Sequence, residues 1–129
     1  MKAKRCFAMP LLLIMLSILI GCSSKLDNVS DEHYQYGMKA IEIVDSYLDY
    51  DIDAEEAYNK VDELMGRADT LPNENISSAT CVMDTCIECD VSLIKYKFSD
   101  LHWHPSNENL EKLKEYRNSL AEYLNLNKR

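Results

Sequence analysis

Apolar residues recur at three- and four-residue steps along most of the chain, and no stretch alternates with period two for long enough to be a strand. This helical period constrains the fold more than any other feature. Helix caps are expected at Ser30 or Asp31, at Asp53 and at Ser106, and a third helix is expected over about residues 74–98. Because few residues separate the first two helices, they must form an antiparallel hairpin. The sequence therefore predicts an all-α protein, an antiparallel four-helix bundle of up-down-up-down topology over residues 30–129.

The first predicted helix has an unusually wide apolar arc. Two stripes lie side by side on it: Tyr34, Met38, Ile41, Val44 and Leu48, and then Tyr36, Ala40, Ile43, Tyr47 and Tyr50. Together they span about 200°, whereas an ordinary surface helix has an apolar arc of a little over about 100°. This helix is therefore either central among its neighbours or has surplus apolar surface. On the second reading, Tyr36, Ile43 and Tyr50 are a candidate contact face for a protein partner.

The N-terminus has the pattern of a secretory signal peptide. Basic residues in the first five positions precede an apolar run from Phe7 to Ile20, which is shorter than the roughly 20 residues that a membrane-spanning helix needs. The run ends in Leu19-Ile20-Gly21-Cys22, which resembles the lipobox of bacterial lipoproteins. The resemblance implies that residues 1–21 are a cleaved lipoprotein signal peptide.

The same resemblance implies a lipid anchor at Cys22. In lipoproteins the lipobox cysteine receives an S-diacylglyceryl group, and in many bacteria its amino group is acylated too, with chains such as palmitate. The chain is then expected at the cell membrane, facing outside the cytoplasm, with residues 22–29 as a flexible tether to the bilayer. The Tyr-rich first helix and the capped segment Asp53–Leu64 are also similar to small helical lipoproteins of Gram-positive bacteria, a group that implies no particular activity.

The charge distribution excludes some partners. Residues 1–21 carry three basic and no acidic residues, so the remaining 108 residues have a formal net charge of −11 rather than −8. Such a domain is not expected to bind nucleic acid or to adhere directly to an anionic membrane surface. Residues 27–90 hold 17 acidic and three basic residues, whereas residues 91–129 hold five acidic and seven basic ones. The two halves are expected to attract each other in the packed domain, and an acidic face for a basic partner is the alternative reading.

Three cysteines remain after Cys22, namely Cys81, Cys86 and Cys89. The C-x-x-C spacing of the last two falls in the middle of a predicted helix, whereas a thioredoxin-like motif starts one. A zinc site would need a fourth ligand such as His102 or His104, which lies about a dozen residues away. We therefore expect no metal or cofactor, and thiol or metal handling by these cysteines is the alternative function.

No nucleophile–base pair or phosphate-binding glycine loop is evident, so the domain is expected not to be an enzyme but a protein-interaction module. Two charged residues interrupt predicted apolar stripes: Asp90 in the third helix and Arg117 in the fourth. If these helices form a hairpin about residues 102–103, Asp90 lies within about one turn of Arg117. The sequence thus predicts a partly buried ion pair between them.

Overall fold

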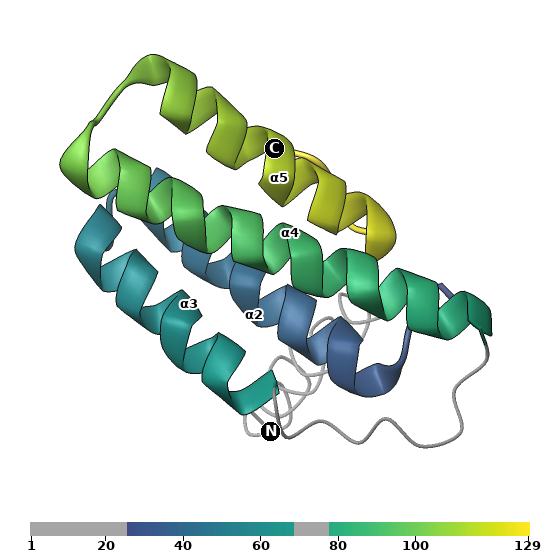
Figure 1. Ribbon diagram of the computed structural model, residues 1–129. Coiled ribbons are helices and arrows are strands. Elements are labelled where there is room, and N and C mark those ends of the chain that lie inside the picture. The colour runs from purple at the N-terminus through teal and green to yellow at the C-terminus, as the bar shows by residue number, and fades with distance from the viewer. Residues whose placement is uncertain (1–25, 69–77) are drawn as a thin grey trace, which may run out of the picture.

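The computed structural model describes residues 26–68 and 78–129. Within these ranges it contains four helices and no strand (Figure 1): α2 Asp31–Leu48, α3 Ala54–Ala68, α4 Ser78–Trp103 and α5 Asn107–Tyr123. Consecutive helices run in opposite directions along the length of the molecule. This confirms the predicted all-α, up-down-up-down four-helix bundle.

The predicted helix caps are present. The Ser30 hydroxyl accepts a hydrogen bond from the backbone N–H of His33 at 3.2 Å and so begins α2. Asp53 Oδ1 accepts the N–H of Glu56 at 2.9 Å before α3. The Ser106 hydroxyl accepts the N–H of Asn109 at 3.1 Å before α5. Each bond satisfies one of the N–H groups that a first helical turn leaves without an intrahelical partner.

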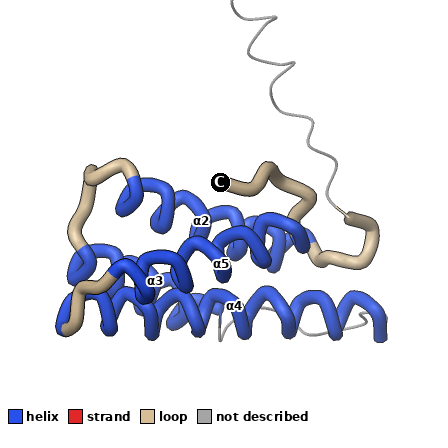
Figure 2. The backbone as a smooth tube through the Cα atoms, turned by 90° about the horizontal axis from the view of Figure 1, so that it is seen from above, coloured by secondary structure: helices blue, strands red, loops and turns tan. Residues whose placement is uncertain are grey.

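Helices α2 and α4 lie opposite each other in the bundle, and each contacts the other three helices, whereas α3 and α5 do not contact one another. This placement explains the wide apolar arc of α2, because neighbours cover it on three sides. The core residues of α2 are Tyr36, Ala40, Ile41 and Val44. The tube view shows α4 at the edge of the bundle opposite α2, with no other labelled helix beyond it (Figure 2).

Close packing of α2 against α5 depends on Gly37. A Cβ atom at this position would lie 2.8 Å from Leu124 Cδ1 and 3.3 Å from both Ile87 Cγ2 and Leu120 Cδ1. The missing side chain therefore allows the N-terminal half of α2 to approach its neighbours closely.

The end of α4 differs from the prediction. The helix continues to Trp103, five residues beyond the expected end at Phe98, because Leu101 is a buried core residue. Pro105 disfavours helical geometry at His104, and the chain turns there. His102 and Trp103 consequently lie in the last helical turn rather than in a loop.

The position of α4's end also overturns the predicted Asp90–Arg117 ion pair. The hairpin turns about residues 104–106 rather than 102–103, so Asp90 lies level with Ser119, whose side chain hydrogen-bonds to it. Arg117 pairs instead with Asp45 of α2, through Nε to Oδ1 at 3.0 Å and Nη2 to Oδ2 at 2.8 Å.

The folded domain begins earlier than expected. Val29, placed in the flexible tether over residues 22–29, is buried in the core, and its N–H donates to the carbonyl oxygen of Leu26 at 3.2 Å. The signal peptide over residues 1–21 and the lipidation site Cys22 lie outside the described residues, so these stay predictions. None of the described helices is long and apolar enough to cross a membrane.

Candidate interaction surface

The outer face of α4 carries apolar side chains at every seventh position. Val82, Cys89, Tyr96 and Trp103 follow one another at this spacing, which returns a helix to within about 20° of the same direction. All four are exposed; for the three larger side chains the exposed fractions are 62% for Val82, 67% for Tyr96 and 72% for Trp103. Leu93, beside this line, is also exposed. We call these five residues the α4 stripe.

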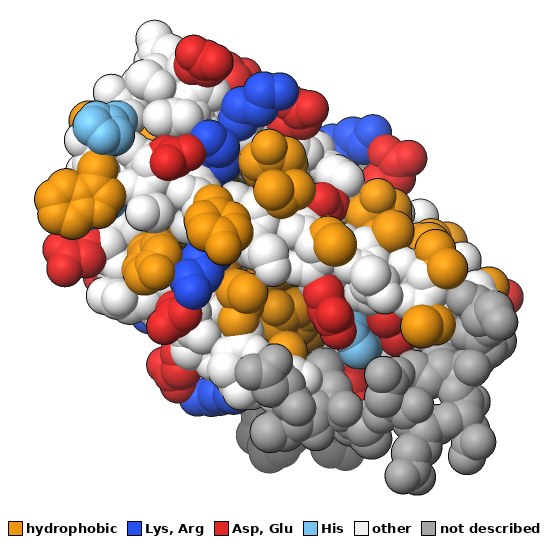
Figure 3. All heavy atoms as spheres, viewed as in Figure 1, with side chains coloured by type: hydrophobic (Ala, Val, Ile, Leu, Met, Phe, Trp, Pro, Cys, Tyr) orange, Lys and Arg blue, Asp and Glu red, His pale blue; other side chains and the backbone are white. Residues whose placement is uncertain are grey.

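The space-filling view shows the α4 stripe from the front. Apolar side chains follow a diagonal across this face, over α4 (Figure 3). Four other side chains on the same arc of the helix are uncharged: Thr85, Cys86, Ser92 and Ser99. Asp100 is the one charged residue on this arc, and it forms an ion pair with Lys97. In a chain with 28% charged residues, a surface with so few charges is stabilised when another apolar surface covers it.

The charged residues that border the α4 stripe are directed to other partners. Lys95 Nζ lies 2.5 Å from Asp62 Oδ1 of α3 and 5.2 Å from the centre of the Tyr58 ring. The hydrogen bond to Asp62 raises the pKa of the Lys95 ammonium, which keeps it charged. On the same border, Glu88 Oε1 lies 2.7 Å from His33 Nε2. These inward contacts hold both charges at the margin of the stripe.

The contact face predicted on α2 does not exist as one surface. Tyr36 is only 6% exposed and Ile43 is half-buried, whereas Tyr50 is 94% exposed. Tyr50 lies in the turn after α2 at a positive φ of 63°, so its side chain does not continue the helical stripe. Among the described helices, the exposed apolar surplus is thus on α4 rather than on α2.

The three cysteines are free thiols in different settings. Cys89 belongs to the α4 stripe, Cys86 is half-buried beside it, and Cys81 is exposed about a quarter-turn away from it. No group of three or more histidine, cysteine, aspartate or glutamate side chains with metal-binding geometry occurs in the described part of the chain. The hypothesis of thiol or metal handling therefore gains no support from the arrangement of these residues.

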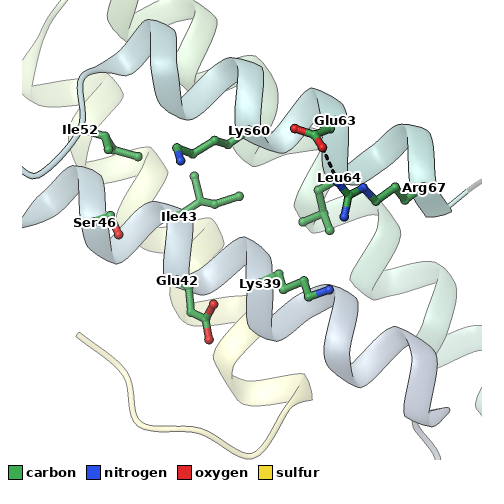
Figure 4. Close-up of a pocket in the computed structure, with 9 residues that line it drawn as sticks. All are labelled: Lys39, Glu42, Ile43, Ser46, Ile52, Lys60, Glu63, Leu64 and Arg67. Atoms are coloured by element: carbon green, nitrogen blue, oxygen red, sulfur yellow. Dashed lines mark hydrogen bonds and ion pairs between the residues drawn. The ribbon is translucent and has the colours of Figure 1, made fainter.

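A second surface feature is a groove of about 420 Å³ between α2 and α3 (Figure 4). Ile43, Ile52 and Leu64 form its apolar part, and polar side chains surround them. The three basic residues between positions 27 and 90 all line it: Lys39, Lys60 and Arg67.

The basic side chains of the groove do not make it an anion site. Lys60 Nζ lies 3.4 Å from Glu56 Oε1, and Arg67 forms an ion pair with Glu63. Glu42 and Glu63 line the same groove. The mixed charges compensate one another, so this groove has no net preference for an anion.

Sequence reasoning missed a buried polar cluster where α2 begins. His33 is 7% exposed; its Nδ1 lies 2.9 Å from Ser30 Oγ and 3.2 Å from Asp84 Oδ2, and its Nε2 contacts Glu88. Asp84 Oδ1 also accepts the backbone N–H of Ser30 at 3.0 Å. Asp84 and Glu88 lie one turn apart on α4, and this acidic pair could have predicted a polar contact. It was missed because the prediction for this helix considered only the spacing of its apolar residues.

This cluster resembles a nucleophile–base arrangement in composition, but its contacts are structural. The Ser30 hydroxyl is occupied as the cap of α2, and the protein itself engages both ring nitrogens of His33. At 7% exposure the imidazole has little surface for a substrate to contact. The cluster therefore attaches the first turn of α2 to α4.

The comparisons with known proteins offer no relative. The chain matches no protein-family model, no curated protein and no solved structure. The α4 stripe is therefore the feature from which a function can be inferred.

Proposed function

We propose that this protein is a membrane-anchored lipoprotein, held at the outer side of the cell membrane through acylated Cys22, that binds a protein partner without catalysing a reaction. The α4 stripe is its contact surface. Burial of a large apolar side chain in an interface contributes about 1.5–3 kcal/mol. Four exposed side chains of this kind on one helix face would therefore stabilise a complex substantially. Tyrosine and tryptophan are also the residue types that most often dominate protein interfaces.

The anchor and the contact surface support each other physically. The described structure begins at Leu26, only a few positions after Cys22, and an extended chain of this length spans at most about 14 Å. A domain tethered this closely diffuses in the plane of the membrane, where confinement raises the effective concentration of any partner that is also anchored. A contact surface of one helix face is then sufficient.

The contact surface is tested by photocrosslinking in living cells. A photoreactive phenylalanine analogue replaces Tyr96 in the full chain and, as a matched control, replaces Tyr50, which is a more exposed tyrosine outside the stripe. The proposal predicts a discrete protein adduct at position 96 and none at position 50. Equal adduct formation at the two positions, or none at 96, contradicts it.

The anchor is tested separately with Cys22→Ala. Membrane pellets of cells supplied with an alkyne analogue of palmitate are expected to contain labelled protein in the wild type and none in the variant. Cys81→Ala is the control, because its thiol is exposed but lies outside the lipobox pattern. Unchanged labelling of the Cys22→Ala protein contradicts lipidation at this residue and leaves the contact surface unaffected.

A further inference from the structure

The α4 stripe changes in size along the helix. Its N-terminal half carries small or medium side chains, Val82 and Cys89, with Thr85 and Cys86 beside them. Its C-terminal half carries the bulky ones, Leu93, Tyr96 and Trp103. The face is therefore hollow at one end and raised at the other, and this asymmetry restricts which second helix face can lie along it.

A second copy of the same face fits in one direction. If two α4 helices lie parallel, Tyr96 meets Tyr96 and Trp103 meets Trp103, while the small residues leave a gap between them. If they lie antiparallel, the two aromatic residues of each copy lie over the small residues of the other. Close packing favours the arrangement in which large and small side chains alternate across the contact.

The charges at the border of the stripe favour the same direction. Glu88 and Lys95 lie on one side of the α4 stripe, seven residues apart. In an antiparallel pair with its two-fold axis between residues 91 and 92, Glu88 of one copy comes level with Lys95 of the other, and the pair repeats by symmetry. The Glu88 side chain keeps 50% of its surface exposed beside His33, and the Lys95 side chain keeps 21% exposed beside Asp62, so each has surface left for this second contact.

The area of the face is compatible with a dimer. A helix of 26 residues is about 39 Å long and about 10 Å wide, so α4 alone supplies about 390 Å². This is about half of the roughly 800 Å² per partner of a standard interface, and the bordering surfaces of α3 and α5 would supply the rest. A bilayer surface fits less well, because the domain is acidic and the cations beside the stripe are few and paired.

We infer that two copies of this chain associate through the α4 stripe in an antiparallel arrangement, with Tyr96 and Trp103 of each copy packed over the segment from Val82 to Cys89 of the other. The inference rests on the proposed function of this face and adds the identity of the partner. It makes the contact isologous, so the same residues serve both copies and no second protein is required.

Crosslinking between cysteines tests both the partner and the direction. The full chain carries Cys81→Ser, Cys86→Ser and Cys89→Ser together with Thr85→Cys and Ser99→Cys, so α4 holds thiols at positions 85 and 99 only. These two positions lie about 21 Å apart along one helix, beyond the reach of a short bismaleimide. Membranes from cells that produce the variant are treated with this reagent, and the dimer band is analysed by peptide mapping. Asn59→Cys in place of Ser99→Cys is the control, because Asn59 is exposed on α3.

The expected product is a dimer in which the thiol introduced at position 85 of one copy is linked to the thiol introduced at position 99 of the other, because these positions come level in the proposed register. A link between the two thiols at position 99 indicates a parallel pair and overturns the inference, as does the absence of any dimer that exceeds the Asn59→Cys control. If dimer is absent while photocrosslinking at position 96 still captures a different protein, the self-association fails and the proposed function stands. If neither experiment gives an adduct, both fail.

Discussion

Arg117 of α5 forms a two-point ion pair with Asp45 of α2, and its Nη1 donates to the backbone carbonyl of Asn127 at 2.7 Å. This guanidinium is buried, whereas Asp45 keeps part of its surface exposed. The contact joins the first and last helices of the bundle and also attaches the chain segment that follows α5. A charged residue in the middle of an apolar stripe thus connects three parts of the structure.

Removal of either partner of this pair is expected to destabilise the fold. Asp45→Ala and Arg117→Ala should each lower the free energy of unfolding by about 2–3 kcal/mol, because a buried charge loses its hydrogen bonds. In urea denaturation the double variant should lose less than the sum of the two. Glu122→Ala, which removes an exposed ion pair with Lys128, is the control and should change stability little. Additive losses for Asp45→Ala and Arg117→Ala would show that the two residues are not coupled.

Asp90 is expected to oppose folding at neutral pH. Burial raises the pKa of its carboxyl, although a hydrogen bond from Ser119 acts in the opposite direction, and its Oδ2 has no hydrogen-bond partner. The folded-state pKa of Asp90 lies above the unfolded-state value of about 3.9, so the carboxyl stays protonated to a higher pH in the folded state. The free energy of unfolding therefore falls as pH rises from the unfolded-state pKa through the folded-state pKa. Below the unfolded-state pKa the penalty is absent.

Asp90→Asn should therefore stabilise the protein at pH 7, by about 1 kcal/mol, the lower end of the cost of an unsatisfied buried group. Thermal melts at pH 7 and pH 3.5 measure the difference, which should vanish at the lower pH. Asp51→Asn changes an exposed carboxylate in the turn before α3 and is the matched control. A gain that is equal at both pH values contradicts the role assigned to ionised Asp90.

The His33 cluster is expected to stabilise the first turn of α2. His33→Ala should lower the free energy of unfolding by about 2 kcal/mol, because it leaves the Asp84 carboxylate buried with fewer partners. Hydrogen exchange of the amides at the start of α2 should become faster in the same variant. His104→Ala removes an exposed imidazole and should do neither. If the two histidine variants behave alike, the cluster has no structural role.

The two glycines in described helices should respond in opposite ways to alanine. At Gly66 of α3 an added Cβ meets no atom within 4 Å, so Gly66→Ala should raise the free energy of unfolding by about 0.5–1 kcal/mol through helix propensity. At Gly37 the same change places Cβ against Leu124 Cδ1, and this clash should cancel the gain. Chemical denaturation of both variants measures the difference. An equal gain at the two positions would mean that α2 does not pack closely against α5.

Periodicity was sufficient to predict the fold, because each apolar stripe here belongs to a helix that packs on its neighbours. The caps at Ser30, Asp53 and Ser106 were predictable for the same local reason. The partner of Arg117 was not predictable, because the register of α4 and α5 depends on where α4 ends. A shift of the turn by about two residues replaces Arg117 with Ser119 opposite Asp90.

The candidate site was harder to predict than the fold. Two helices, α2 and α4, carry more apolar residues than one packed face requires. The sequence alone does not show on which of the two helices the additional apolar residues are buried by neighbouring helices. Both helices contact the other three, but most apolar residues of α2 face those neighbours, whereas four large apolar side chains of α4 lie on its outer face and are exposed. Tyr36 is consequently a core residue, while Tyr96 and Trp103 are the exposed ones.

Coverage of the α4 stripe can be measured directly with the native cysteines. Intact cells are treated with a maleimide that does not cross membranes, and labelling at each thiol is quantified by peptide mass spectrometry, with purified protein at high dilution as the reference. Both Cys89, within the stripe, and Cys81, outside it, are exposed in the monomer. Cys89 is predicted to be protected in cells relative to Cys81, and Tyr96→Ala with Trp103→Ala should abolish this protection. Equal labelling of Cys81 and Cys89 in cells would contradict the proposal that a protein covers this face.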